Sequence, residues 1–419
     1  MSGLLAGVRV LDVSNFVSGP LCGYMLAQLG AEVIKIEEPQ AGDPSRRLGS
    51  DPALSVDMMG SAYLATNSGK RSVALNLKSG EGADIFKRLV RQSTVVLENF
   101  RPGVMARLGL GYEQLRSVNP KLVYCAISGF GQNGPLCEYP AFDQIIQGMS
   151  GLMSVTGTQD TGPLRTGVPI SDTIAGLTAA MAIAAAVHRL HREGIGSMVD
   201  VAMLDSLIGA MGWTVSNYLI AGAVPRPMGN DNFTSSPSGT FAAADGMLNI
   251  AINTEQQYQR LLKALNRPEL ALDPRFATRE SRKQYRHAMN AAVEESLRHR
   301  TVSDWTEVMA REGVPSGAVL SVQEALSLPQ LEHRKLVQRF ESALPGPRDL
   351  QVLRAGFHVD GEAVGVSSPP VVLGADTLDV LMAAGLSAEE IHELGKRGVI
   401  VTAMNGKNAS DNDVKPKSA

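Results

Sequence analysis

Short apolar runs alternate with amphipathic stretches over the first third of the chain. The runs are rich in Val, Ile and Leu and have the length of buried strands, at 8–13, 33–37, 72–77, 95–99 and 122–127. Between them, apolar residues recur at helical spacing in 21–29, 82–91 and 114–118. Strands that alternate with helices predict a parallel sheet covered on both faces, a Rossmann-like α/β layer. Such sheets bind ligands at the carboxyl ends of their strands.

A long apolar, Ala-rich run begins just after Asp172 and predicts a helix buried in the core. Ser171 and Asp172 are favoured residues for its N-cap. A carboxylate at that position is favoured by the helix dipole and by free backbone N–H groups. Asp172 can therefore be a nucleophile, or its site can hold the anion that such a nucleophile releases. It can also be no more than a helix cap.

The pattern changes after a further predicted strand at 198–204 and helix at 207–220. Turn-forming residues dominate 223–239, and hairpin signals at 240–243 and 248–252 precede helical stretches at 256–265, 285–299 and 302–312. A strand-like run at 350–357 and a helical pattern at 378–394 indicate a return to the first domain. The predicted organisation is a large domain (1–222), a small α+β domain with its linker (223–327), the return (328–401) and a disordered polar tail (402–419).

Composition removes several classes of function. The 419 residues are 44% hydrophobic with a net charge of −3, so nothing predicts binding to nucleic acid or to an anionic membrane. Cys22, Cys125 and Cys137 lack the spacing of a disulfide framework or a zinc site and fit a reducing compartment. No cleavable leader is recognisable at the N-terminus, so we expect a cytoplasmic protein. Neither a GxGxxG, a Walker A nor an HExxH pattern occurs, and no metal site is predicted.

Seven stretches in order resemble the class III CoA-transferases of the CaiB/BaiF type, which include formyl-CoA:oxalate and crotonobetainyl-CoA transferases. The resemblance covers about residues 4–400. It is carried by 11–14 with Ser18-Gly-Pro20, by 29–39 and 69–78, by Glu98-Asn-Phe-Arg-Pro-Gly103 and Leu108-Gly-Leu-Gly-Tyr112, and by 128–135 and 199–205.

The resemblance implies that Asp172 is the nucleophile of a CoA transfer through an aspartyl anhydride and an aspartyl-CoA thioester. CoA thioesters would be substrates, with no tightly bound cofactor. It also implies an interlocked homodimer with a large and a small domain in each chain. The family's CoA contacts carry over by position to Val17, Ser18, Leu75, Asn76, Leu77, Lys78, Asn99, Phe100, Arg101, Arg107, Ala141, Phe142 and Asp143. Lys78, Arg101 and Arg107 suit phosphates, although without the resemblance each would more often be a solvated surface charge.

The sequence also departs from the formyl-CoA transferases. Glu38 stands where they carry an arginine near the adenine, Val17 replaces a glutamine, and 229–239 replaces a loop of glycines. These differences argue against formate and oxalate as the natural pair. Members that use succinyl-CoA with a dicarboxylate are more similar. A dicarboxylate needs a second cationic anchor, for which Arg46, Arg47 and Arg165 are candidates by position.

Two other functions are compatible with parts of this pattern. The α-methylacyl-CoA racemases resemble the chain in fold and motifs, but they use a histidine and an aspartate as an acid/base pair. Phe142 stands where that histidine would be, and phenylalanine cannot transfer a proton. A protein that binds acyl-CoA without turnover is the second alternative, and a covalent adduct on Asp172 would distinguish it from an enzyme.

Overall fold

The computed structural model describes residues 3–344 and 348–403, and the chain forms two compact units. The larger unit comprises the described residues within Met1–Leu152, Thr166–Ala221 and Gln330–Ala419, and the smaller comprises Met153–Arg165 and Gly222–Pro329. The segment 153–165, which the sequence analysis assigned to the large domain, belongs to the smaller unit. Most of the tail predicted as disordered, 404–419, lies outside the described residues.

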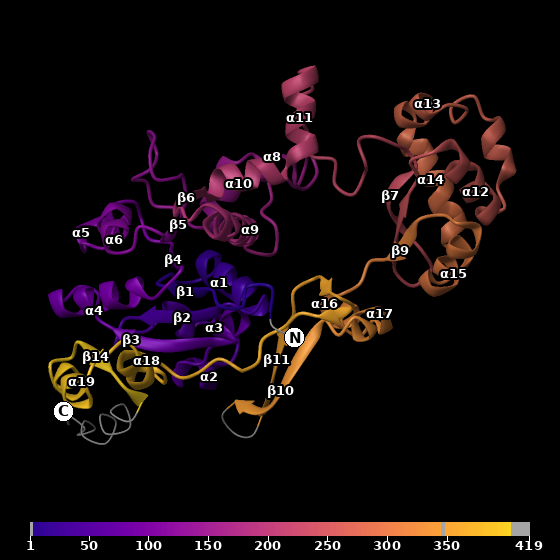
Figure 1. Cartoon of the computed structure of the whole chain (residues 1–419). Coiled ribbons are helices and arrows are strands. Elements are labelled where there is room, and N and C mark those ends of the chain that lie inside the picture. The colour runs from indigo at the N-terminus through magenta and orange to yellow at the C-terminus, as the bar shows by residue number, and fades with distance from the viewer. Residues whose placement is uncertain (1–2, 345–347, 404–419) are drawn as a thin grey trace, which may run out of the picture. The chain divides into compact units, whose positions relative to one another are not determined.

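The large unit is built on a seven-stranded sheet with the strand order β14-β3-β2-β1-β4-β5-β6 (Figure 1). All neighbouring pairs are parallel except β14 with β3, which is antiparallel. The strands are β1 (Arg9–Asp12), β2 (Glu32–Glu37), β3 (Lys70–Leu75), β4 (Val95–Glu98), β5 (Val123–Ser128), β6 (Ser197–Ala202) and β14 (Ile400–Val401). The order reverses at β1, and this switch point is where open parallel sheets bind ligands.

The strands are buried on both faces because their apolar side chains alternate between two cores. In β1, Val10 packs into one core and Leu11 into the other. One core contains side chains of α4 (Gly80–Arg91), α6 (Tyr112–Val118), α18 (Thr377–Ala383) and α19 (Ala388–Lys396). The other contains side chains of α1 (Ser18–Gln28), α9 (Ile170–Glu193) and α10 (Met203–Ala210). The expected parallel sheet with helices on both faces is thus confirmed.

Several predicted boundaries are wrong, each for a local reason. The strand predicted at 198–204 ends at Ala202, because α10 begins at Met203. The helix predicted over 207–220 is two helices, α10 and α11 (Gly212–Ala221). The pattern at 378–394 is likewise interrupted, since Gly385 adopts a φ of 86° between α18 and α19. An apolar period continues across such breaks and does not show them.

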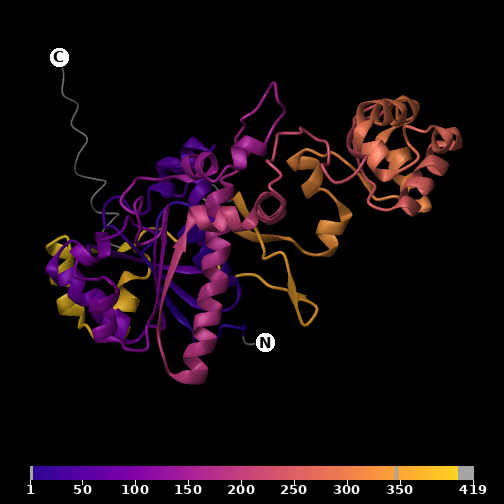
Figure 2. The same cartoon turned by 90° about the horizontal axis from the view of Figure 1, so that it is seen from above.

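The helix α9 departs from expectation at both its start and its surface. Its N-cap is Pro169, so Asp172 lies within the first turn and is not the cap. The helix packs against the sheet and α1 (Figure 2), and it buries a face of small residues that includes Ala175 and Ala179. Its opposite face exposes Met181 at 68%, so α9 is only half a core helix within one chain. By length and composition α9 could also cross a membrane. A single helix of this kind is weak evidence for a membrane protein, because buried core helices meet the same criteria.

Shorter elements complete the large unit. They are η1 (Pro44–Arg47), α2 (Pro52–Val56), α3 (Ser61–Asn67), α5 (Val104–Arg107), α7 (Asp143–Met149), the antiparallel pair β10 (Val337–Leu344) and β11 (Arg348–Leu353), and the pair β12 (His358–Val359) and β13 (Glu362–Ala363). Two short helices, α8 (Leu152–Val155) and α17 (Pro329–His333), lie where the chain passes from one unit to the other.

The small unit has a core of its own around a three-stranded antiparallel sheet. Its strands β7 (Ser238–Ala242) and β8 (Met247–Ala251) form the hairpin that the sequence predicted, and β9 (Ser316–Ala318) pairs with β8. The helices are α12 (Glu255–Leu265), η2 (Pro268–Leu272), α13 (Arg279–Gln284), α14 (Arg286–Leu297), α15 (Val302–Glu312) and α16 (Val322–Leu326). Phe241, Leu261 and Met289 are among the buried residues that join sheet and helices.

Candidate functional site

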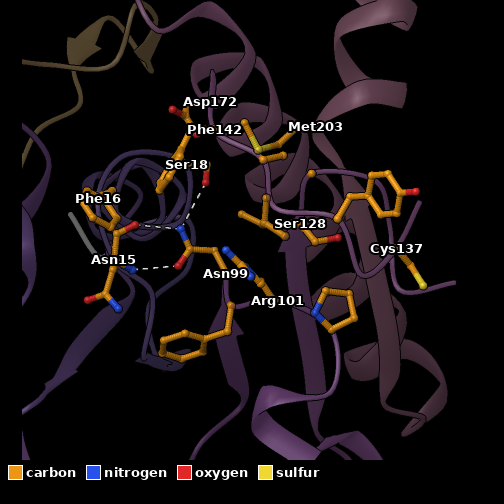
Figure 3. Close-up of a pocket in the computed structure, with 16 residues that line it drawn as sticks. Asn15, Phe16, Ser18, Asn99, Arg101, Ser128, Cys137, Phe142, Asp172 and Met203 are labelled. Atoms are coloured by element: carbon orange, nitrogen blue, oxygen red, sulfur yellow. Dashed lines mark hydrogen bonds between the residues drawn. The ribbon is translucent and has the colours of Figure 1, made fainter. Parts of the chain in front are cut away.

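A cavity of about 230 Å³ lies in the large unit at the carboxyl ends of β1, β4 and β5 (Figure 3). The loops after β1 and β4 form part of its wall, the end of β5 forms another part, and the first turn of α9 contributes Asp172. The lining residues are Asn15, Phe16, Ser18, Asn99, Phe100, Arg101, Pro102, Ile127, Ser128, Gly129, Cys137, Tyr139, Ala141, Phe142, Asp172 and Met203. This is the edge of the sheet at which the strand pattern predicted a ligand.

Asp172 is the acidic residue in the cavity wall, and its environment disfavours the charged form. Its pKa is raised from 3.8 to about 7, first because burial removes water from the carboxylate and second because Asp143 lies nearby. A hydrogen bond from Ser18 acts in the opposite direction. The dipole of α9 also favours the anion, but only by about 0.3–1 kcal/mol, less than one pKa unit. Desolvation therefore outweighs the dipole on which the sequence prediction relied.

Ser18 is tied to the loop after β4 by Asn99. The Asn99 side chain accepts a hydrogen bond from the Asn15 backbone N–H at 2.8 Å and donates one to the Asn15 carbonyl at 2.8 Å. The same amide nitrogen donates to the Ser18 hydroxyl at 3.3 Å. The three side chains labelled Asn99, Ser18 and Asp172 follow one another along the cavity wall (Figure 3).

Asp143 lies behind Asp172, with its side chain occupied by protein groups. The Ser171 backbone N–H donates to Asp143 at 2.8 Å, the Ser171 hydroxyl at 2.7 Å, and the Gln147 amide at 2.7 Å. Asp143 is 8% exposed and does not line the cavity. It thus fastens the first turn of α9 to α7, and its proximity raises the pKa of Asp172.

The loop after β1 rests on two ion pairs that are fully buried. Lys70 Nζ lies 2.9 Å from Asp12 Oδ2, and Lys35 Nζ lies 2.9 Å from Asp43 Oδ2. Lys35 also donates to the backbone carbonyl of Ser14 at 2.8 Å. Buried charges of this kind are costly unless all of them are paired, and here they fix the backbone that carries the cavity residues 15–18.

Two aromatic side chains border the cavity and expose apolar surface. The rings of Phe16 and Phe142 meet edge to face with their centroids 5.9 Å apart. Phe16 is 37% and Phe142 66% exposed. Phe16 also has a left-handed backbone with φ of 65°, and its N–H donates to Asp43 at 3.2 Å. A bulky residue in this conformation is strained, and such strain is common at functional sites.

The structure brings together about half of the predicted site. The cavity wall contains seven of the predicted residues: Ser18, Asn99, Phe100, Arg101, Ala141, Phe142 and Asp172. Val17 is the N-cap of α1, and Leu75–Lys78 lie at the end of β3 and after it. Arg107 ends α5 and is exposed. These residues do not line the cavity, but CoA is much longer than the cavity, so their role stays a prediction.

Sequence reasoning missed other residues of the wall. Asn15 and Phe16 belong to the loop after the first predicted strand, and Ser128 and Gly129 begin a motif already noted, so position alone could have found them. Met203 lies within the motif at 199–205 and could have been found in the same way, whereas only the fold brings Cys137 and Tyr139 to the cavity. In residues 3–344 and 348–403, no group of three His, Cys, Asp or Glu side chains could hold a metal ion.

One predicted anchor for a dicarboxylate is wrong. Arg46 is 0% exposed, and its guanidinium makes hydrogen bonds of 2.6 and 2.8 Å to Glu37. The guanidinium also stacks on the Tyr63 ring, 3.8 Å from its centroid. An arginine already paired in the core cannot receive a substrate carboxylate. Arg47 and Arg165 are exposed, and nothing places either of them in the cavity wall.

A Rossmann-like sheet with a partly buried carboxylate in the cavity at its switch point is compatible with an acyl-transfer enzyme, and comparison with known proteins defines the class. The chain belongs to CoA-transferase family III, whose sequence model matches residues 5–377. It is therefore a CoA-transferase, as the seven motifs predicted.

The relatives extend over most of the chain. Succinate–glutarate CoA-transferase from Agrobacterium fabrum is 37% identical over 351 residues, which is 82% of this chain and 88% of that protein. Acetyl-CoA:oxalate CoA-transferase from Acetobacter aceti is 38% identical over 80% of this chain and 85% of that protein. The crystal structure of a CAIB/BAIF family protein from Brucella suis has a TM-score of 0.79 and 32% identity, and the match covers 92% of this chain and 100% of that one.

Proposed function

We propose that this enzyme transfers CoA from succinyl-CoA to a dicarboxylic acid through covalent intermediates on Asp172. The observation that carries the proposal is a partly buried carboxylate with a raised pKa in the wall of the cavity at the switch point of the sheet. A carboxylate that holds its proton more tightly is also a stronger nucleophile once it is ionised. Because the pKa of Asp172 is about 7, the ionised form is accessible at neutral pH.

The transfer divides into balanced steps. The Asp172 carboxylate attacks the acyl carbonyl of the donor thioester, the C–S bond breaks, and a mixed anhydride and CoA thiolate form. The thiolate then attacks the Asp172 carbonyl, the anhydride C–O bond breaks, and the donor acid leaves as its carboxylate. Asp172 now carries CoA as a thioester. The acceptor carboxylate repeats the two steps in reverse, which returns Asp172 and releases the new acyl-CoA. No step requires a redox change.

The cavity supports this sequence of steps in two ways. The aromatic surface of Phe16 and Phe142 beside Asp172 limits the access of water, which would otherwise hydrolyse an anhydride. Arg101 in the same wall is a cation that suits a phosphate of CoA. The racemase alternative gains no support, because Phe142 occupies the position of the required base and no histidine lines the cavity.

The choice of donor and acceptor rests on the relatives. The name of the Agrobacterium fabrum protein pairs succinate with glutarate, and that of the Acetobacter aceti protein pairs acetyl-CoA with oxalate. Each name includes a dicarboxylic acid. Succinyl-CoA with glutarate is therefore the first pair to test. The argument against oxalate from the departures at Val17 and Glu38 stays a prediction.

The test is an exchange assay with succinyl-CoA or acetyl-CoA and a panel of mono- and dicarboxylic acids, with new thioesters detected by mass spectrometry. We expect a new dicarboxylyl-CoA with the native enzyme and none with Asp172→Asn, which keeps the shape and removes the nucleophile. Mass spectrometry of the intact protein should find CoA bound to Asp172 before an acceptor is added. Exchange by Asp172→Asn would refute the mechanism, and α-deuterium incorporation into a 2-methylacyl-CoA without exchange would favour the racemase.

We also propose that the enzyme is an interlocked homodimer in the cytoplasm. Apolar residues remain exposed on the large unit of a single chain, including Met181 on α9 and Leu219 and Ile220 on α11, at 68%, 74% and 85%. Apolar surface of this extent is typical of protein interfaces. Light scattering of the purified protein should give twice the 44.5 kDa of one chain. A monomer at micromolar concentration would contradict the proposal.

A further inference from the structure

A series of hydrogen bonds, each with a defined donor and acceptor, begins at the backbone of the loop after β1 and leads toward Asp172. The Asn99 amide is paired with both polar groups of the Asn15 backbone, each at 2.8 Å. The Asn15 N–H must meet the amide oxygen, and the Asn15 carbonyl must meet the amide nitrogen. The orientation of the Asn99 side chain is therefore fixed by its partners and cannot be reversed without the loss of both bonds.

This orientation determines what the Ser18 hydroxyl can do. The Asn99 nitrogen has two hydrogens, one of which is donated to Asn15 and the other to Ser18 Oγ at 3.3 Å. Ser18 Oγ is thus an acceptor toward Asn99, and its single hydrogen remains free to be donated elsewhere. Ser18 is 3% exposed, so little of its surface is open to water. Asp172 lines the same cavity as Ser18, and the Ser18 hydroxyl lowers the pKa of the Asp172 carboxyl as a hydrogen-bond donor.

The backbone brings the two helices close enough for this contact. Gly176 of α9 lies one turn after Asp172, and a Cβ on it would stand 2.6 Å from the Ser18 carbonyl oxygen. Gly19 is similarly constrained, since a Cβ there would stand 2.2 Å from Ser14 Cβ. Only glycine permits these approaches, so the first turn of α1 lies against α9 at Gly176 and against the loop after β1 at Gly19.

We propose that Ser18 and Asn99 are positioning residues for Asp172: Asn99 directs the Ser18 hydroxyl hydrogen onto the carboxylate and so holds Asp172 as an oriented anion. This inference rests on the proposed function of Asp172 as the nucleophile. It assigns the side chain of Asn99 a part in the reaction in addition to its predicted contact with CoA. A hydrogen bond to the charged form of a buried acid favours that form, in opposition to the desolvation described above.

The experiment is a pH profile of kcat/KM for succinyl-CoA with glutarate, in which the acid limb reports the ionisation of the free enzyme. Ser18→Ala removes the donor, so we expect the midpoint of that limb to move to higher pH by about one unit. Asn99→Asp keeps the shape but replaces the donor by an acceptor, which takes the Ser18 hydrogen and adds a negative charge. Its midpoint should move in the same direction by at least as much. Above the new midpoints, both variants should recover most of the native kcat/KM.

The control is Ser93→Ala, which removes a hydroxyl of similar burial (5% exposed) that donates to the Leu89 carbonyl outside the cavity. This variant should retain the native midpoint. Circular dichroism establishes whether each variant is folded. If Ser18→Ala does not fold, the pH profile of Asn99→Asp alone tests the inference. Overlapping profiles, or a loss of the same factor at every pH, would overturn the inference.

Failure of the proposed function is recognised separately. If Asp172→Asn still exchanges CoA, the carboxylate is not the nucleophile and the mechanism fails as a whole. If Asp172→Asn is inactive while Ser18→Ala and Asn99→Asp keep the native midpoint, only the positioning role is wrong.

Discussion

Gly176 of α9 lies against Ser18 of α1 so closely that a methyl group at position 176 would stand 2.6 Å from the Ser18 carbonyl oxygen. The contact joins the helix that bears Asp172 to the helix that begins at the switch point of the sheet. The position of the carboxylate thus depends on a residue that has no side chain and takes no part in the chemistry.

Substitution of Gly176 should therefore affect both stability and catalysis. Gly176→Ala forces the two helices apart, at a cost of about 1–3 kcal/mol of unfolding free energy and a loss in kcat of about tenfold or more. Gly209→Ala is the matched control, because a Cβ at that helical position meets no atom within 4 Å. It should stabilise the protein by about 0.5–1 kcal/mol. Thermal denaturation and the exchange assay measure both effects, and equal behaviour of the two variants would show that the close contact is unimportant.

The raised pKa of Asp172 predicts a pH-dependent cost to stability. The folded carboxyl binds its proton more tightly than the unfolded one, with pKa values of about 7 and 3.8. The cost is therefore absent below about pH 4 and develops as the pH rises through 7. Asp172→Asn removes it, so the variant should match the native enzyme near pH 4 and exceed its unfolding free energy by roughly 1–4 kcal/mol at pH 8. Urea denaturation at several pH values tests this, and a difference independent of pH would contradict it.

Lys70→Met should be among the most damaging changes outside the cavity. It leaves the buried Asp12 carboxylate without its partner, which costs about 3–5 kcal/mol. A second change, Asp12→Asn, removes the uncompensated charge and should restore part of that loss. Lys121→Met, at an exposed position, should leave the melting temperature nearly unchanged. The prediction is wrong if Lys70→Met and Lys121→Met have the same melting temperature.

Phe142→Ala should make the enzyme a less efficient transferase and a better hydrolase. Phe142 is largely exposed, so its removal costs little stability but opens the cavity beside Asp172 to water. We expect the ratio of succinyl-CoA hydrolysis to CoA exchange to increase several-fold, measured by free thiol release with and without acceptor. Phe357→Ala, also at an exposed position in the large unit, is the control. An unchanged ratio would mean that Phe142 does not restrict water.

The two arginines predicted to contact CoA should differ. Arg101 lines the cavity and Arg107 does not. Loss of one charge-assisted contact to a phosphate corresponds to about tenfold in affinity, so Arg101→Ala should raise KM for acyl-CoA by that factor with little change in kcat. The effect should diminish as salt is added. Arg107→Ala should change KM less, and a larger effect from Arg107 would place the phosphates away from the cavity.

The sequence was informative where chemistry depends on a local pattern. Alternating apolar runs predicted the parallel sheet, and its carboxyl edge is where the cavity lies. Asp172 stood out because one acid precedes a long apolar helix. What the pattern could not supply was the environment of that acid. The pKa of Asp172 depends on burial and on Asp143 and Ser18, which reach it from other elements.

Arg46 illustrates a prediction from position in the sequence that was wrong. As a basic residue near the predicted site it suggested a substrate anchor, and in the structure it is an internal counter-charge to Glu37. Position along the chain does not indicate whether an arginine points into the core. The pairing arises because η1 folds back toward the end of β2, a tertiary contact with no local signature.

β14 has a consequence for the synthesis of the protein. It pairs with β3, yet roughly 320 residues separate the two strands, which is about 16–65 s of translation at 5–20 residues per second. Throughout that time a nascent chain on the ribosome has the outer edge of β3 without its final neighbour. An open strand edge is a template for pairing with other chains. The growing polypeptide therefore exposes the β3 backbone at Ala74 and Leu75 until β14 leaves the exit tunnel, and a message truncated just short of residue 400 would leave that end of the edge without its partner strand.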